Sequence, residues 1–251
     1  DKQKDALHRY QFLQKFLKES KKFGAQRRVS EAKAVNISLE NLSRNMGYSD
    51  VTRLIWNMET ALINEMKEYF VPKKLDDVDV YIKIDDLGQS EIIYEKAGKE
   101  LKSLPTKLKK DKYIEDIKEV HKNLKEQYRR SRKMLEEAME DGTEFYGYEI
   151  ENLMTNPVIA PILKSLVFKM DKNLGYYVDK KLKSAKKKAV AVKDDSLLKI
   201  AHCFDLFESG DWASYQKDIF DRELKQPFKQ VFRELYVKTA DEKGRDKSLR
   251  Y

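Results

Sequence analysis

The chain has 251 residues, of which 41% are hydrophobic and 37% are charged, and its formal net charge is +8. Its 14 tyrosines and 11 phenylalanines argue against disorder, which requires low hydrophobicity as well as charge. A single cysteine excludes an internal disulfide framework, and no apolar run approaches the roughly 20 residues that cross a bilayer. We therefore expect a cytoplasmic protein that has no membrane partner.

The first 75 residues predict three antiparallel helices. Apolar residues recur with helical spacing over residues 2–22, which indicates the first helix. A second helix is expected to begin near Ser30 and to end at Gly47. Asp50 is a capping residue for a third helix. This helical segment has the pattern expected at the end of a helical array.

Residues 76–251 predict a mixed domain. Two β-branched or aromatic strands flank a glycine-containing turn, and the longest helix follows, with apolar residues at spacings of three and four. The fold class is therefore α+β, a helical part followed by small antiparallel sheets and one long helix. The expected elements are strands at 79–84, 91–94, 166–170, 175–178 and 189–192, and helices at 111–139, near 149–155, from Pro157 and from Asp211. The segment 226–236 could be a strand or a helix, and we favour a strand.

Common catalytic motifs are absent from the sequence. It contains no GxxxxGK[ST] phosphate loop, GxGxxG, HExxH or CxxC pair, so we expect no cofactor and no metal. His202 and Asp205 are interpreted as a structural hydrogen-bonded pair, and Cys203 as a small buried residue whose side chain points away from His202 on a strand. A catalytic role is the less favoured alternative, with a pocket around His202, Asp205, Arg233 and Glu234.

The segment 226–236 is the better candidate for a contact surface. On the predicted strand, polar and apolar residues mix on both faces, unlike the alternation of a half-buried strand. Contact with another domain would explain this mixture, and we favour it over a ligand groove. The expected interface residues are Gln226, Phe228, Gln230, Phe232 and Tyr236.

Two basic clusters support a nucleic-acid-binding alternative. One leads into and along the long helix, and the other lies in an expected loop between strands. Lysine supplies affinity for phosphate without reading base sequence, but a solvated lysine-rich surface is the interpretation we favour. The cluster residues are Lys107, Lys109, Lys110, Lys112, Arg129, Arg130, Arg132, Lys133, Lys180, Lys181, Lys183, Lys186, Lys187 and Lys188.

Five long runs resemble the bacterial MolR-like domain of unknown function. That family is found in large proteins with WGR domains and helical repeats, which are labelled molybdate-metabolism regulators. The resemblance implies a scaffold or interaction module of a larger regulatory or stress-response protein, truncated here at its C-terminus, with other domains of that protein or another protein as partners. WGR domains elsewhere accompany DNA-end recognition, which keeps nucleic acid as an alternative partner. The runs are LENLSRNMGYSDVTRLIWNME from Leu39, AGKELKSLPTKLKKD (97–111), LMTNPVIAPILKSLVF (153–168), LKIAHCFDLFESGDW (198–212) and QPFKQVFRELY (226–236).

Overall fold

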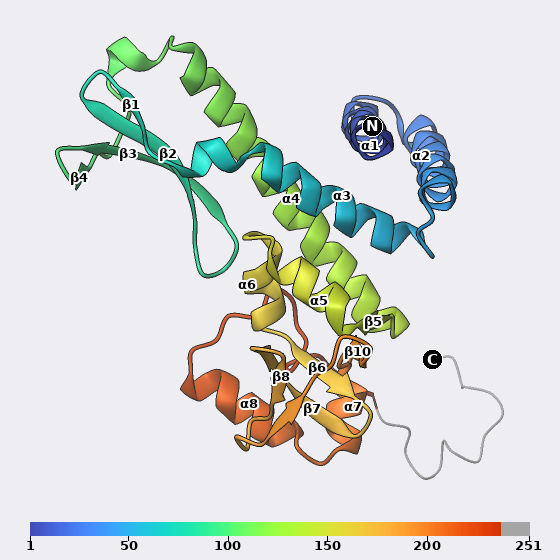
Figure 1. The fold of residues 1–251 in the computed structure, drawn as a ribbon. Coiled ribbons are helices and arrows are strands. Elements are labelled where there is room, and N and C mark those ends of the chain that lie inside the picture. Colours follow the sequence, from blue (N-terminus) through green and yellow to red (C-terminus); the bar gives the residue numbers. More distant parts are fainter. Residues whose placement is uncertain (237–251) are drawn as a thin grey trace. The chain divides into compact units, whose positions relative to one another are not determined.

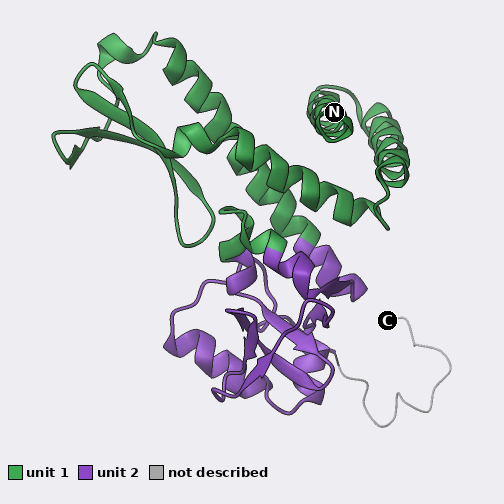
Figure 2. Ribbon diagram, viewed as in Figure 1, with its two compact units in different colours: residues 1–134, 152–161 green, residues 135–151, 162–251 purple. Residues whose placement is uncertain are grey.

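The structure is a computed structural model that describes residues 1–236, and it contains two compact units (Figure 2). The first unit comprises residues 1–134 and 152–161, and the second comprises residues 135–151 and the chain from residue 162. The predicted α+β class is confirmed by an N-terminal helical part and antiparallel sheets of four and six strands. The predicted division at residue 75 stays a prediction, since these units are defined by contacts. The expected C-terminal truncation falls outside the described residues.

Three helices open the first unit, as predicted (Figure 1). The second of them begins before Ser30, with Gly24 at the N-cap, so the predicted start at Ser30 is wrong. Gly47 ends that helix with a φ of 79°, a left-handed conformation that glycine adopts without strain. Leu7, Tyr10 and neighbouring apolar side chains form a core between the helices. The helices are α1 Lys2–Ser20, α2 Ala25–Met46 and α3 Val51–Glu65.

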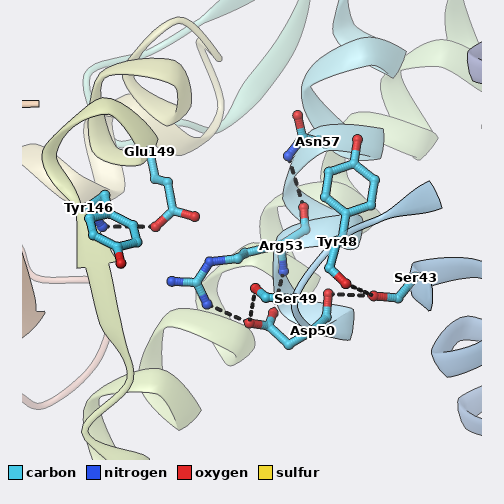
Figure 3. A network of polar contacts seen from close by, with 8 residues as sticks. All are labelled: Ser43, Tyr48, Ser49, Asp50, Arg53, Asn57, Tyr146 and Glu149. Atoms are coloured by element: carbon cyan, nitrogen blue, oxygen red, sulfur yellow. Dashed lines mark hydrogen bonds and ion pairs between the residues drawn. The ribbon is translucent and has the colours of Figure 1, made fainter. Parts of the chain in front are cut away.

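A polar network fixes the turn between α2 and α3 (Figure 3). The Ser43 hydroxyl donates to the backbone oxygen of Asp50 at 2.8 Å. The Asp50 carboxylate then accepts the Arg53 backbone N–H at 2.8 Å and forms an ion pair with the Arg53 guanidinium. One turn later, the Asn57 amide donates to the Arg53 carbonyl at 3.0 Å. The predicted cap at Asp50 is therefore confirmed.

A four-stranded antiparallel sheet completes the first unit, together with the long helix. The sheet order follows the sequence, and the predicted hairpin forms its centre. Ile114 and Ile117 of the long helix share a buried cluster with Val80 and Ile82 of the sheet. The elements are η1 Lys67–Phe70, β1 Lys73–Leu75, β2 Val78–Ile84, β3 Ser90–Lys96, β4 Lys99–Glu100, η2 Thr106–Leu108 and α4 Lys112–Asp141, whose last residues belong to the second unit.

The second unit is built around a six-stranded antiparallel sheet in the order β5-β10-β6-β7-β8-β9. Helices α7 and α8 pack on it, because Leu206, Tyr215 and Ile219 share a core cluster with Val167 and Tyr176 of the sheet. The hairpin predicted from the strands at 166–170 and 175–178 is confirmed, and so is the helix from Asp211. The elements are β5 Glu144–Tyr146, α5 Gly147–Met154, α6 Ile159–Lys164, β6 Val167–Met170, β7 Asn173–Val178, β8 Lys181–Lys183, β9 Ala189–Ala191, β10 Leu197–Ile200, α7 Cys203–Glu208 and α8 Trp212–Asp221.

The segment 226–236 is not the predicted strand. It has neither helical nor strand structure over its described residues. The physical reason is that the Gln230 side chain binds the backbone of Val167 and Ala201, while β6, which contains Val167, already pairs with β10 and β7. Among the helices of the described part of the chain, none has both the length and the apolar character needed to span a bilayer.

Candidate functional site

The four residues of the catalytic alternative belong to the second unit. His202 is the N-cap of α7, and its Nδ1 accepts the Phe204 backbone N–H at 3.3 Å. The Asp205 carboxylate in turn accepts the backbone N–H of His202 at 3.0 Å. The two residues therefore form a capping box, in which each side chain binds the backbone of the other end of the first helical turn.

Asp205 is held by two lysines. Its side chain is 7% exposed, and its Oδ1 lies 2.6 Å from Nζ of Lys169 and 3.1 Å from Nζ of Lys199. Burial raises the pKa of this carboxyl, but the hydrogen bonds from Lys169, His202 and Lys199 outweigh burial and leave the pKa below its ordinary value. Both oxygens already have donors, so the geometry favours a structural anion over a general base.

Cys203 is buried at the first position of α7. Its sulfur lies 3.8 Å from Nδ1 and 3.9 Å from Nε2 of His202. The expected orientation of the two side chains to opposite faces is wrong, because these residues begin a helix instead of continuing a strand. The nearly equal distances place the sulfur out of line with either ring nitrogen, and burial raises the pKa of the thiol. This environment disfavours a thiolate nucleophile.

Arg233 is directed to the last turns of α4. It forms ion pairs with Glu140 and with Glu136, the latter at 3.7 Å. Glu234 is exposed. The structure thus brings His202 and Asp205 together, but it gives Arg233 a different set of partners. Within residues 1–236, no group of three or more His, Cys, Asp or Glu residues could hold a metal ion.

The two glutamines of the predicted interface form hydrogen bonds to backbone groups of the second unit. Gln230 is fully buried, its Oε1 accepts the Val167 N–H at 2.9 Å, and its Nε2 donates to the carbonyls of Val167 and Ala201, each at 2.8 Å. Gln226 donates to the Ser165 carbonyl and to Gln230 Oε1, each at 2.9 Å. These amides hold the segment 226–236 to β6 and to the end of β10.

The aromatic residues of the same segment differ in exposure. Phe228 is 5% exposed and contributes to the core, whereas Phe232 is 51% exposed and Tyr236 is 73% exposed. Of the five predicted interface residues, these last two present most of their side chains to solvent. A contact surface at this segment would therefore depend on Phe232 and Tyr236.

The second unit exposes two aromatic rings on α7 and one at Phe232, and the partly buried Trp212 contacts both segments. Phe204 and Phe207 lie one helical turn apart on α7 and are 45% and 46% exposed. The ring of Phe207 meets that of Trp212 edge to face, with centroids 6.3 Å apart. The Trp212 indole N–H donates at 2.6 Å to the carbonyl of Val231, which precedes Phe232. We call these four rings, of Phe204, Phe207, Trp212 and Phe232, the aromatic surface.

The basic cluster around the long helix is partly neutralised. Lys107 lies 2.8 Å from the Asp76 carboxylate. The guanidinium of Arg130 lies 2.7 Å from Glu59, so it forms an ion pair with a buried carboxylate of the first unit. The other residues predicted in this cluster are exposed, namely Lys109, Lys110, Lys112, Arg129, Arg132 and Lys133.

The second basic cluster is not wholly a loop, because Lys181 and Lys183 belong to β8. Lys180 lies 3.4 Å from Asp194, and Lys186 forms an ion pair with Asp211. Every lysine of this cluster is exposed. Partial pairing with acids lowers the local excess of positive charge that phosphate binding requires.

Sequence reasoning missed a cleft of about 530 Å³ in the first unit, lined by α1, the end of α3 and α4. Glu59 of α3 lies in its wall and is 1% exposed. Tyr10 donates to Glu59 at 2.6 Å, and Gln127 donates to the Glu59 carbonyl at 2.9 Å. The signal in the sequence is a set of polar residues with helical spacing on each of α1 and α4.

Comparison with known proteins identifies a family. Residues 1–58 match the model of a family described as "Family of unknown function (DUF5724)". No curated protein and no solved structure matches the chain. Residues 98–251, more than half of the chain, match the model described as "Domain of unknown function (DUF4132)". The chain therefore belongs to the family of that domain, DUF4132.

Proposed function

We propose that the chain is a protein-interaction module, whose second unit binds another protein domain through the aromatic surface. The observation that carries this proposal is the exposure of Phe204, Phe207 and Phe232, at 45%, 46% and 51%. Aromatic rings are enriched at the centres of protein interfaces, and contiguous exposed apolar groups mark interaction sites. Truncation of such rings commonly removes a large part of the binding energy.

The hydrogen bonds that hold the residues of the aromatic surface in place support this proposal. Gln230 and Gln226 join the segment before Phe232 to the sheet, and the Trp212 indole is fixed by its hydrogen bond to Val231. Side chains that are already ordered lose less conformational entropy when a partner binds. A rigid surface of this kind suits a scaffold.

The interaction module also fits the chemistry of the residues once considered catalytic. Asp205 is occupied by lysines and a backbone N–H, Arg233 by glutamates, and the Cys203 thiol has a raised pKa. These contacts stabilise the unit that presents the aromatic rings. We therefore assign the residues a structural role and favour a non-enzymatic function.

The resemblance to the MolR-like domain suggests the setting of this module. We infer a larger bacterial regulatory or stress-response protein, in which the partner is another domain or a separate protein. A nucleic-acid-binding regulator acting through the exposed lysines remains the second candidate. The two candidates differ in which side chains touch the partner.

Photo-crosslinking tests the proposal. The chain carrying p-benzoylphenylalanine in place of Phe207 is expressed in native host cells and irradiated. We expect a covalent adduct with a protein, because the photoreactive ring would lie in the interface. Phe220 of α8, which is 80% exposed and is not part of the aromatic surface, provides the matched control position.

The pattern of adducts distinguishes the candidates. A protein adduct from position 207 that is absent from position 220 supports the interaction module. Adducts that contain nucleic acid, formed instead from a photoreactive group at Lys187, would favour the nucleic-acid candidate. The absence of any adduct specific to position 207 contradicts the proposal.

A further inference from the structure

Strand β9 lies at one edge of the six-stranded sheet, because β8 is the only strand of the described chain that pairs with it. Its residues Ala189 and Ala191 are exposed, and Val190 between them is partly buried. An edge strand presents unpaired backbone groups that can accept a further strand. The free edge of β9 is therefore a candidate site for strand addition.

The pairing with β8 determines which backbone groups of β9 point away from the sheet. The N–H of Ser184 donates to the Lys188 carbonyl at 2.8 Å. The N–H of Val192 donates to the Lys180 carbonyl at 2.8 Å. Hydrogen-bonded pairs alternate with other pairs in an antiparallel ladder, so the two alanines of β9 fall in the pairs that are not hydrogen-bonded. Their N–H and C=O groups point away from β8, which gives the free edge both donors and acceptors.

The lysines on β8 and next to β9 in the chain give this edge a positive charge. Within residues 1–236, these lysines form no ion pair, unlike Lys180 and Lys186 of the same cluster. A segment that pairs with β9 is therefore expected to carry negative charge. The exposed lysines without an ion pair are Lys181, Lys183, Lys187, Lys188 and Lys193.

The register places two of these lysines on the same face as the alanines of β9. Lys181 lies opposite Ala191, and one pair further along Lys183 lies opposite Ala189. Residues opposite each other on neighbouring strands have side chains on one face, so an added strand would continue each row. Its Cα atoms would lie two strand spacings from β8, about 10 Å. Because alanine is small, lysine and glutamate side chains can meet across β9 over this distance.

The other face of the hairpin is apolar. Val190 lies opposite Leu182, and Leu182 lies opposite Tyr177 of β7. Leu182 and Tyr177 are each 1% exposed, whereas Val190 is partly exposed. An apolar residue opposite Val190 on an added strand would continue this row and would be stabilised by burial.

From this arrangement we propose that β9 binds an extended acidic segment of a partner protein by strand addition. The segment carries a carboxylate opposite each alanine of β9, within reach of Lys181 and Lys183, and an apolar residue opposite Val190. Its backbone donates to and accepts from the free edge. Its sequence therefore alternates acid, apolar residue, acid.

Two other occupants match the edge less well. The phosphates of a nucleic acid would accept from the N–H groups of the edge, but they supply no donors for its carbonyls. A second copy of β9 would bring the lysines of two chains together, and like charges oppose such pairing. The acidic segment provides donors, acceptors and the complementary charge.

This site uses none of the residues of the aromatic surface, and it should bind its partner more weakly. Exposed ion pairs each contribute little to binding. We therefore expect a transient complex that dissociates during co-purification and is measured at equilibrium in solution.

Titration with acetyl-Thr-Glu-Val-Glu-Val-Glu-Thr-amide tests the proposal, using amide chemical shifts of the full 251-residue chain. We expect saturable shifts at the amides of β8 and β9. The peptide acetyl-Thr-Glu-Glu-Val-Val-Glu-Thr-amide has the same composition and charge but lacks the alternation. It is expected to bind about tenfold more weakly.

Variants of the protein separate the backbone from the charge. Ala191→Pro removes an N–H that β8 does not use, so the ladder should remain while binding weakens by about tenfold. Lys181→Glu with Lys183→Glu should weaken binding by about tenfold or more. Lys225→Glu with Lys229→Glu makes the same charge change at exposed positions outside β8 and β9, and should alter binding by less than about twofold. Unchanged shifts elsewhere in the second unit verify the fold of each variant.

Four outcomes would overturn the proposal. The first is the absence of saturable shifts with the alternating peptide, and the second is equal binding of the two peptides. The third is an equal effect of the two pairs of lysine substitutions. The fourth is a different occupant of the edge. Equal shifts with oligouridylate at the same concentration would identify a polyanion site, and a dimer that Ala191→Pro dissociates would identify a second copy.

Discussion

Gln230 is the residue on which the C-terminal segment of the second unit depends most. Its amide binds Val167 and Ala201, and the side chain is fully buried. Gln230→Ala removes three buried hydrogen bonds to the backbone, so the free energy of unfolding should fall by about 2–4 kcal/mol. Gln216→Ala on α8 is the control and should change it by less than about 0.5 kcal/mol. Urea unfolding measures both, and equal midpoints for the two variants would contradict this role.

Glu59 and Arg130 form the buried ion pair of the first unit. The Glu59 side chain is 1% exposed and that of Arg130 is 30% exposed. Arg130→Met should lower the free energy of unfolding by about 3 kcal/mol, since it leaves a buried carboxylate without its cation. Adding Glu59→Leu removes that charge, and the double variant should recover part of the loss. A double variant less stable than Arg130→Met alone, in urea titrations, would contradict this account.

Asp205 links stability to pH. Burial raises its pKa, but the hydrogen bonds from Lys169, His202 and Lys199 lower the pKa below the ordinary value of 3.8. The unfolded state therefore binds this proton more readily, so the stabilisation is present above pH 3.8 and is lost as the pH falls through the lower folded pKa. Asp205→Asn should make the free energy of unfolding less dependent on pH below about 4. Thermal melts from pH 2 to pH 6 measure this, and unchanged pH dependence counts against the ion pair.

At the scale of elements, a comparison of two glycines distinguishes the energetic cost of backbone strain from the cost of a close contact. Gly88, with a φ of 81°, lies where an added Cβ would be 2.4 Å from the carbonyl oxygen of Val158. Gly98 has a similar φ of 76°, but nothing lies within 4 Å of an added Cβ. Gly98→Ala should therefore cost about 1 kcal/mol from strain alone, and Gly88→Ala about 3 kcal/mol or more.

Urea titrations that monitor Trp56 of α3 compare these two variants in the first unit. The matched values of φ make the difference between them a measure of the contact with Val158. Equal losses of stability for both variants would show that this close approach has no energetic effect.

The elements with long periodic patterns could be predicted from the sequence. The spacing of apolar residues predicted α1, α3 and α4, and alternation around a turn predicted the β2–β3 hairpin. The short strands β5 and β8 were missed, because three residues carry too little pattern and their partners lie far along the chain. Helix α7 was missed because it has six residues and its cap is a histidine, which is not a preferred capping residue.

The segment 226–236 could not be predicted for a different reason. Its local pattern allowed a strand or a helix, and the outcome was decided by amide contacts of Gln226 and Gln230 with distant backbone groups. Such contacts are tertiary, so no spacing within the segment reveals them. The exposure of Phe204 and Phe207 of α7 also depends on tertiary packing. Of the three exposed rings, the sequence therefore predicted only Phe232 at an interface.

At the scale of the whole molecule, the central claim is that the aromatic surface binds a protein. A variant with Phe204→Ser, Phe207→Ser and Phe232→Ser removes three exposed rings, so the core and the fold should be retained. Serine substitution of Lys181, Lys183, Lys187 and Lys188 provides a matched control for the second candidate. Circular dichroism should show unchanged secondary structure for both variants.

Quantitative co-purification from the native host tests this claim most directly. We predict a protein that is recovered with the unchanged chain and with the lysine variant, and whose recovery falls at least about tenfold with the aromatic variant. A bound component that is lost with the lysine variant but retained by the aromatic variant would contradict the claim.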